Sequence, residues 1–180
     1  MDLSDTSFET ERLLVRSCQV ADAEALAGLM TPSISACLAT WPAPLSVAQA
    51  RAIVVDFIEA ATVGKAFGAV IISKQTGEIV GWFKIDLSEA PEVVGEFGYW
   101  IGEAHQRKGY AYEITRGAFD FAFHILNVTV MRAGARLDND ASLKLLEKLG
   151  MTCVGSERFW TPARERYEDC AFWEYEKPRR

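Results

Sequence analysis

The 180-residue sequence contains few of the side chains that build metal and redox centres. Its four cysteines are scattered, none in a Cys-x-x-Cys pair, and its two histidines lie apart. Zinc ligation and thiol redox chemistry need such residues at short spacing, so we expect neither a metal site nor a redox pair. The cysteines are expected to be reduced and buried. They are Cys18, Cys37, Cys153 and Cys170.

Long hydrophobic runs and an excess of positive charge are also absent. No apolar run approaches the roughly 20 residues that a membrane span requires, and the first five residues lack the basic start and apolar stretch of a signal peptide. We therefore expect a cytoplasmic protein without a membrane partner. The net charge of −6 argues against nucleic acid as a main partner and mildly favours cationic acceptors.

Hydrophobic periodicity divides the chain into strands and helices. Strands are expected over residues 11–16, 67–73, 79–86, 93–101, 129–136, 152–159 and 170–176. Helices are expected over residues 21–30, 47–61, 110–126 and 141–149. The order βααβββαβαββ predicts an α/β fold, with helices on both faces of a central mixed, mostly antiparallel sheet of about seven strands.

The length fits one domain with a sizeable core. No repeat, linker or shift in composition divides the chain. We expect a single domain over residues 9–176, with loose ends at residues 1–8 and 177–180.

The most informative segment joins the fourth expected strand to the third long helix. The strand ends at Ile101, a polar turn containing Gly109 follows, and the helix opens immediately after it. The first N–H groups of a helix have no partner within it, and the helix dipole adds partial positive charge at the same end. Together with the charges of Arg107 and Lys108, the turn suits a phosphate or pyrophosphate.

Four separated signatures place this turn in a family context. They are Thr10-Glu11-Arg12-Leu13, Trp41-Pro42, Gly98-Tyr99-Trp100-Ile101 followed by the Gln-x-x-Gly-x-Ala turn at 106–111, and Asn139-Asp140-Ala141-Ser142 continuing to Glu147-Lys148-Leu149-Gly150-Met151. In this order, over residues 9–176, they resemble the RimJ/RimL-type branch of the GNAT acetyltransferase superfamily.

The resemblance implies acetyl-CoA as co-substrate and a primary amine as acceptor, with direct attack in a ternary complex. The acceptor is a protein N-terminus or a small amine, and the chain is a monomer or homodimer. The sheet is expected to splay between its fourth and fifth strands, with the thioester in the resulting wedge. The backbone amides expected on the pyrophosphate are those of Arg107, Lys108, Gly109, Tyr110, Ala111 and Tyr112. The pantetheine arm is expected along Trp100, Ile101 and Gly102 and at Asn139.

Glu96 is the leading candidate for the general base, because it lies on the fourth strand near the position where many superfamily members keep a glutamate. Strand alternation places it on the face opposite Phe97 and Tyr99. The alternative is an ordinary solvated or salt-bridged glutamate. Asp86, at the end of the preceding strand, could serve as base or hold a cationic acceptor, but a solvated aspartate is the favoured interpretation.

The proton donor for the leaving thiolate is less clearly marked. Many members of the family use a tyrosine at the position that is Leu146 here. Ser142, one turn earlier, resembles a serine that RimJ/RimL-type members place near the sulfur; its alternative role is to cap its own helix. Asn139 is expected to be the N-cap of the same helix as well as a pantetheine contact.

Aromatic and histidine side chains add little to the site. Trp41, flanked by prolines, could wall the acceptor pocket, whereas Trp82, Trp100 and Trp173 are expected in the core. His105 and His124 are assigned no role.

Two other kinds of function compete with acetyl transfer. Because Leu146 stands where many family members have a tyrosine, the chain could instead be a CoA-binding sensor or interaction module without turnover. A nucleotide enzyme that uses the same turn is less favoured, because neither a G-x-x-x-x-G-K-[ST] nor a G-x-G-x-x-G pattern is present.

Overall fold

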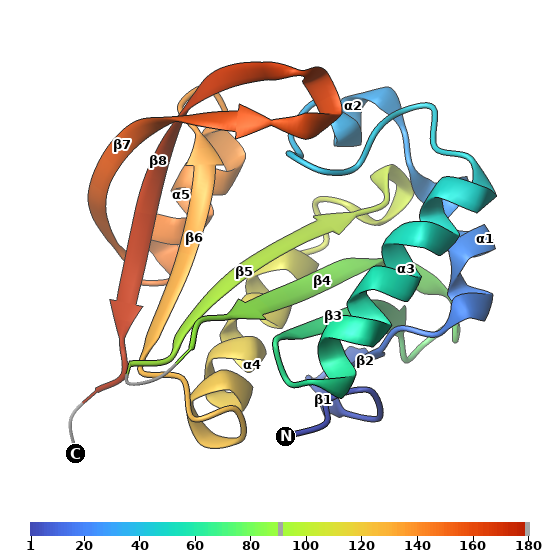
Figure 1. Cartoon of the computed structure of the whole chain (residues 1–180), viewed down its shortest axis with the longest axis horizontal. Helices are drawn as coiled ribbons and strands as arrows, with labels where there is room; N and C mark the ends of the chain where they lie inside the picture. Colours follow the sequence, from blue (N-terminus) through green and yellow to red (C-terminus); the bar gives the residue numbers. More distant parts are fainter. Residues whose placement is uncertain (90–91, 179–180) are drawn as a thin grey trace.

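The computed structural model describes residues 1–89 and 92–178 and forms one eight-stranded sheet in the order β1-β2-β3-β4-β5-β6-β8-β7 (Figure 1). The strands are β1 (Ser7–Glu9), β2 (Leu13–Ser17), β3 (Ala66–Ser73), β4 (Ile79–Leu87), β5 (Val94–Ile101), β6 (Val130–Arg136), β7 (Thr152–Thr161) and β8 (Arg166–Glu176). The α-helices are α1 (Ala23–Leu29), α2 (Pro32–Ser35), α3 (Val47–Thr62), α4 (Tyr110–His124) and α5 (Asp140–Lys148). Three short 3₁₀ helices are η1 (Val20–Asp22), η2 (Glu103–His105) and η3 (Pro162–Arg164).

The predicted fold class is confirmed, with one strand more than expected. Every described strand pair is antiparallel except β5–β6. The additional strand, β1, lies partly in the segment expected to be loose, where it pairs with β2. Its three residues are too few to show a period, so only the pairing defines it. At the C-terminal end, which was also expected to be loose, the Lys177 N–H donates to Thr129 O at 2.8 Å. Residues 179–180 lie outside the described part of the chain.

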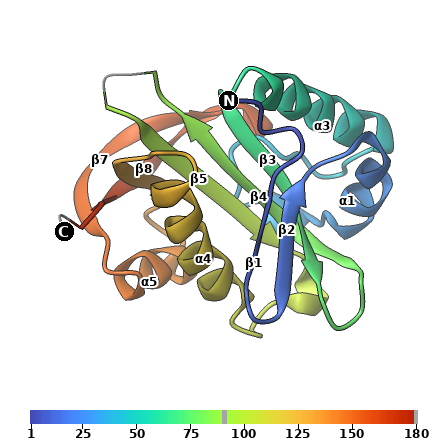
Figure 2. The same ribbon diagram turned by 90° about the horizontal axis from the view of Figure 1, so that it is seen from below.

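Helices cover both faces of the sheet (Figure 2). On one face α1 and α3 pack over a cluster that contains Trp82 and Trp100, and on the other α4 packs over Phe97 and Phe83. The α3 helix begins where the capping box predicts: Ser46 Oγ accepts the Gln49 N–H at 3.2 Å. No helix in residues 1–89 and 92–178 is long and apolar enough to cross a membrane.

The sheet splays between β5 and β6, the fourth and fifth strands of the predicted order. The two strands pair through only three residue pairs, the last of them Glu96 with Arg132. From there β5 stays with β4 as far as Ile101, while β6 stays with β8 as far as Arg136. The two halves of the sheet therefore diverge, as Figure 1 shows for the ribbons of β5 and β6.

The expectation for the cysteines is only half correct. Cys18 and Cys170 are buried, but Cys37 and Cys153 are exposed, and all four are free thiols. Cys153 lies next to the irregularity in pairing between Cys153 and Gly155 on the outermost strand, β7. Its exposure follows from that edge position, which sequence periodicity does not reveal.

A buried carboxylate fastens the end of the β7–β8 hairpin. Glu168 is 8% exposed and accepts hydrogen bonds from Arg164 Nε at 2.9 Å, Arg166 Nη2 at 2.7 Å and Thr161 Oγ1 at 3.1 Å. The hydrogen bonds from Arg164 are the main reason that the pKa of Glu168 falls from 4.5 to about 2. Burial opposes the shift, and the bonds from Arg166 and Thr161 support it.

Arg164 and another arginine, Arg136 at the end of β6, also bond to the end of α2 and the loop that follows it. Arg164 Nη1 donates to Ser35 O at 2.8 Å and to Leu38 O at 2.7 Å. Arg136 Nη1 donates to Ala36 O at 2.6 Å. We call Glu168, Arg164 and Arg136 the hairpin clamp; it joins segments 100 to 129 residues apart in sequence.

We predict that Glu168→Gln lowers the free energy of unfolding by about 2 kcal/mol, because it leaves guanidinium groups of the hairpin clamp without their carboxylate. The pKa of Glu168 is depressed, from 4.5 to about 2, so its contribution is fully present above pH 4.5 and is lost as the pH falls toward 2. Urea unfolding of both proteins at about pH 6 and about pH 3 should therefore show a smaller difference at the lower pH.

The matched control is Glu157→Gln, a change at an exposed position on β7. It should leave the urea midpoint unchanged at both pH values. Equal midpoints for wild type and Glu168→Gln near pH 6 would contradict the prediction.

Candidate active site

The turn before α4 presents a row of unused backbone donors. Gly109 is the N-cap of α4, with φ 81°, and Arg107 also has a positive φ of 60°. Within the described residues, no hydrogen bond is donated by the backbone N–H groups of six consecutive positions. They are Arg107, Lys108, Gly109, Tyr110, Ala111 and Tyr112. The same six were predicted to bind pyrophosphate, and free N–H groups at a helix N-terminus are what an anion requires.

Four side-chain hydrogen bonds fix the position of the turn. Arg12 Nη1 donates to Lys108 O at 2.9 Å, and Arg12 Nε donates to Glu113 Oε2 at 2.7 Å. Glu113 also accepts from Thr10 Oγ1 at 2.6 Å. At the other end, Gln106 Nε2 donates to Ile101 O at 3.0 Å. These bonds tie the turn both to the segment between β1 and β2 and to the end of β5.

Glu113 is held ionised by its partners. Burial tends to raise its pKa, but hydrogen bonds from Thr10 and from the backbone and guanidinium of Arg12 outweigh that effect and lower the pKa below its ordinary value. The sequence motifs contain Arg12 and Gln106, but only the structure shows that they position the turn. Glu113 carries no motif signal, because its partners lie about a hundred residues away in the chain.

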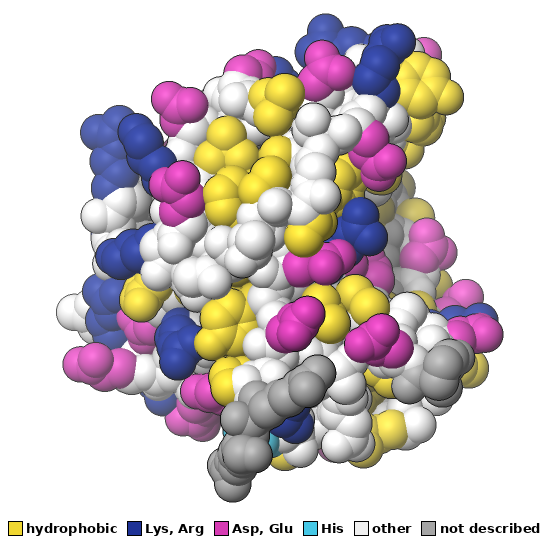
Figure 3. Space-filling view, turned by 90° about the vertical axis from the view of Figure 1, so that its left-hand side faces the viewer, with side chains coloured by type: hydrophobic (Ala, Val, Ile, Leu, Met, Phe, Trp, Pro, Cys, Tyr) yellow, Lys and Arg dark blue, Asp and Glu magenta, His cyan; other side chains and the backbone are white. Residues whose placement is uncertain are grey.

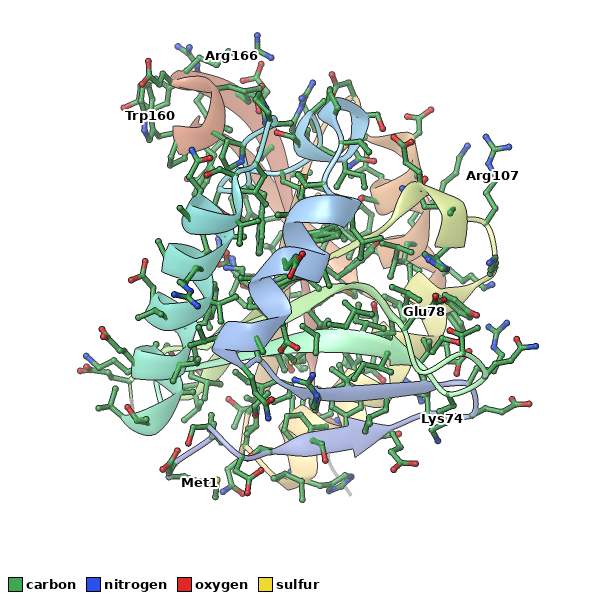
Figure 4. All side chains as sticks on the ribbon, turned by 90° about the vertical axis from the view of Figure 1, so that its right-hand side faces the viewer. Met1, Lys74, Glu78, Arg107, Trp160 and Arg166 are labelled. Atoms are coloured by element: carbon green, nitrogen blue, oxygen red, sulfur yellow. The ribbon has the colours of Figure 1, made fainter. Side chains whose placement is uncertain are left out.

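The surface around the turn is open and basic. A Cβ added at Gly109 would meet one atom, Arg12 Nη2, at 3.5 Å, so the space beside Gly109 is open. The side chain of Arg107 points outward from the molecule (Figure 4). Figure 3 shows Lys and Arg side chains along its left edge, the side that carries α4 and α5. The local charge is therefore suited to phosphates, although the net charge of the chain is −6.

The unpaired edge of β5 continues from this turn. Trp100 and Ile101 pair with Trp82 and Gly81 of β4, which leaves the opposite edge of β5, facing β6, without a strand partner. The Trp100 side chain is 4% exposed and packs in the core, so this residue offers its backbone rather than its ring. The Gly102 N–H is already used, because it donates to Val80 O at 2.9 Å.

Glu96 lies at the last residue pair before the strands diverge. Its neighbours across the strands are Asp86 on β4 and Arg132 on β6. Among the described residues no ion pair or hydrogen bond engages the half-buried Glu96 carboxylate, whereas Asp86 is paired with Lys84. The Arg132 guanidinium lies over the Phe172 ring, 4.7 Å from its centroid. Of the two acidic candidates, Glu96 is therefore the one whose carboxylate has no partner in the described part of the chain.

The α5 side of the wedge holds the remaining candidates. Asn139 is the N-cap of α5, as predicted, and its Oδ1 accepts the Ser142 N–H at 3.2 Å. Since Asn139 supplies the cap, Ser142 does not need its hydroxyl for that purpose. Leu146 is 3% exposed and belongs to the core. Tyr99 on β5 is a further titratable group of this region, and burial raises the pKa of its phenol to about 12.

Trp41 lies on the far side of the β4–β5 pair from α5. It is 4% exposed, with its ring edge-on to Trp82 at 5.2 Å and to Trp100 at 5.3 Å. Its contact with an acceptor stays a prediction, since the structure shows it packed in the core. No group of three or more His, Cys, Asp or Glu side chains in the described part of the chain is placed to hold a metal ion.

The sequence of the chain matches a known protein family over most of its length. Residues 12–152 match the model of the acetyltransferase (GNAT) domain. The chain belongs to this family. The GNAT proteins are acetyl-CoA-dependent acetyltransferases, and the match begins at Arg12, which holds the turn, and spans all of α4 and α5. The resemblance inferred from the sequence motifs is confirmed.

Individual relatives agree with the family. The chain is 29% identical over 161 residues to an uncharacterized N-acetyltransferase, p20, of Bacillus licheniformis, covering 89% of this chain and 90% of that protein. Its fold matches ribosomal-protein-S5-alanine acetyltransferase of Vibrio fischeri, with a TM-score of 0.79, 23% identity and coverage of 97% and 100%. It also matches Mycobacterium smegmatis RimJ in complex with CoA-disulfide, with a TM-score of 0.82, 18% identity and coverage of 96% and 88%.

We predict that Gly109→Val weakens binding of acetyl-CoA by at least about tenfold, because a branched side chain would hold phosphates away from the free N–H groups. The matched control is Gly77→Val. Gly77 also has a positive φ, 73°, and open space around its Cβ, but it lies in the β3–β4 hairpin. Both variants should lose about 1–3 kcal/mol of stability through backbone strain.

Only Gly109→Val should change the dissociation constant for acetyl-CoA, measured by calorimetry. Equal affinities for the two variants would place the phosphates elsewhere.

Proposed function

We propose that this GNAT protein transfers the acetyl group of acetyl-CoA to a primary amine by direct attack in a ternary complex. The observation that carries the proposal is the continuity of two free surfaces, the six unused N–H groups of the turn and the unpaired edge of β5. An extended ligand with a pyrophosphate at one end and amide groups along its arm has the chemistry to fill both.

We assign a role in this reaction to three residues beside the gap between β5 and β6. Acetyl-CoA supplies an activated acetyl group as a thioester. Glu96 receives a proton from the acceptor amine, directly or through a water, because its carboxylate has no other partner among the described residues. Ser142 donates a hydrogen bond toward the departing sulfur, and Asn139 contacts the pantetheine arm while it caps α5.

Two acceptor classes fit the proposed site. The names of the related RimJ and S5-alanine acetyltransferases favour a protein N-terminus. The net charge of −6 and the acidic residues Asp86 and Glu96 on adjacent strands favour a small cationic amine. In both cases the acceptor approaches on the face of β5 opposite α5, where Glu96 lies.

A CoA-binding module without turnover is the second candidate. It is favoured by Leu146, a buried aliphatic residue at the position where many GNAT enzymes keep a tyrosine acid. The free carboxylate of Glu96 argues for turnover instead.

We predict that acetyl-CoA, at about 100 times its dissociation constant, stabilises the protein by about 2.7 kcal/mol in thermal unfolding, whereas ATP and NAD at equal concentration do not. The same preparation should release free thiol from acetyl-CoA when offered an amine. A panel of N-terminal peptides and small polyamines separates the two acceptor classes. Stabilisation without thiol release from any amine would favour the binding module; stabilisation by ATP or NAD alone would contradict both proposals.

We predict that Glu96→Gln lowers kcat by about 10²–10⁴-fold and leaves the dissociation constant for acetyl-CoA unchanged, because only proton removal is lost. Glu92→Gln, an exposed position just before β5, is the control and should behave as wild type. Asp86→Asn is measured beside them. If Asp86→Asn lost more activity than Glu96→Gln, the base would be Asp86.

A further inference from the structure

Two glycines interrupt the side chains on the sheet face that carries Glu96. The last residue pair between β5 and β6 is Glu96 with Arg132. Two residues further along each strand, alternation puts Gly98 of β5 and Gly134 of β6 on the same face as that pair. The two glycines therefore lie at the same level on either side of the divergence. We call these two positions without side chains the glycine window.

The neighbours of both glycines confirm this placement. The atom nearest to a Cβ added at Gly98 would be Lys84 Cε at 3.2 Å, and the atom nearest to one added at Gly134 would be Phe172 Cε1 at 3.0 Å. Lys84 and Phe172 are also their partners across the strands. Gly98 is half-exposed and Gly134 is exposed, whereas the alanines on either side of Gly134 are buried. The glycine window therefore faces solvent on this side of the sheet.

Larger side chains bound the glycine window along both strands. Trp100, the next residue of β5 on this face, is buried, and its ring lies edge-on to Trp41 at 5.3 Å. Arg136, the next such residue of β6, is bonded to the backbone just after α2. At the other end the strand pair of Glu96 and Arg132 closes the sheet. The window is thus a short interval at the start of the wedge, next to Glu96.

The charges around the glycine window favour an ammonium group. Lys84 is paired with Asp86, and Arg132 Nε lies 4.0 Å from Glu174 Oε1. The Glu96 carboxylate has no such partner in residues 1–89 and 92–178. These pairs leave one negative charge beside the window that is not neutralised, and a protonated amine is attracted to it.

We propose that the acceptor amine enters the wedge through the glycine window, and that the absence of side chains at Gly98 and Gly134 limits how bulky an acceptor can be. This inference rests on the proposed function. There the arm of acetyl-CoA occupies the edge of β5, so the acceptor needs a separate path to the thioester. The window supplies that path beside Glu96, the proposed base. A side chain placed in it would hinder the amine and spare the donor.

The test begins with Gly98→Val, because the nearest atoms belong to the flexible side chain of Lys84 and valine suits a strand. With the most active amine of the panel, this variant should raise KM for the amine at least about tenfold. The dissociation constant for acetyl-CoA, measured by calorimetry, should not change. The control is Gly28→Val on α1, where an added Cβ has no atom of the described residues within 4 Å. It should match wild type in both measurements.

Gly134→Ala tests the other side of the glycine window. Its new methyl group would lie against the Phe172 ring, so the ring has to shift slightly, and KM for the amine should rise here too. With both variants, the bulkier of two accepted amines should lose more activity than the slimmer one. A general loss of folding or of donor binding would affect the two amines equally.

The outcomes distinguish this inference from the proposed function. If wild type turns over and both variants keep its KM for the amine, the glycine window is not the entrance, while the function stands. Weaker binding of acetyl-CoA to Gly98→Val, or equal losses with the two amines, would also overturn the inference. If wild type releases no thiol with any amine, the function fails and the inference fails with it.

Discussion

The short pairing between β5 and β6 is the constraint on which the rest of the structure depends. Three residue pairs join the two halves of the sheet, and each half is then completed by its outer neighbours, β4 on one side and β8 on the other. Backbone groups within a fold normally find partners, so an edge left open in the middle of a sheet is a place where another molecule can pair. The splay places that edge directly before the turn of α4.

The fold has to stabilise this opening from outside, because the sheet itself does not. Arg12 and Glu113 fasten the turn to the segment just before β2, and the hairpin clamp fastens the β7–β8 hairpin to the end of α2 and the loop after it. Figure 4 shows Trp160 and Arg166 at the far end of that hairpin, projecting from the molecule. Each fastening joins segments about a hundred residues apart, so the wedge is held by long-range polar contacts on both sides.

Local sequence signals were sufficient for the longer elements and for the turn, but not for the short β1 and α2. The alternation of β5, the capping box at Ser46 and the N-cap at Asn139 depend on neighbours within a few residues, and the structure shows all three. The splay was inferred from the family resemblance, since periodicity cannot show where pairing stops. Glu113 was missed as a candidate because its partners Thr10 and Arg12 lie about a hundred residues earlier in the chain. The partners of Glu168 are near it in sequence, and it was missed because only the folded hairpin buries its carboxylate among them.

In the proposed site, the acetyl-CoA donor and the amine acceptor are recognised by different kinds of group. Similarity in fold therefore bears on the donor more than on the acceptor. The proposed donor site consists of N–H groups and a strand edge, which many side-chain combinations can form provided that a small residue occupies Gly109. A fold match at about 20% identity is therefore compatible with a common donor. The acceptor, in contrast, would meet side chains such as Glu96, Asp86 and Arg132, each of which a single substitution can change. Because specificity is a difference in affinity set by such contacts, the acceptor has to be identified on this chain itself.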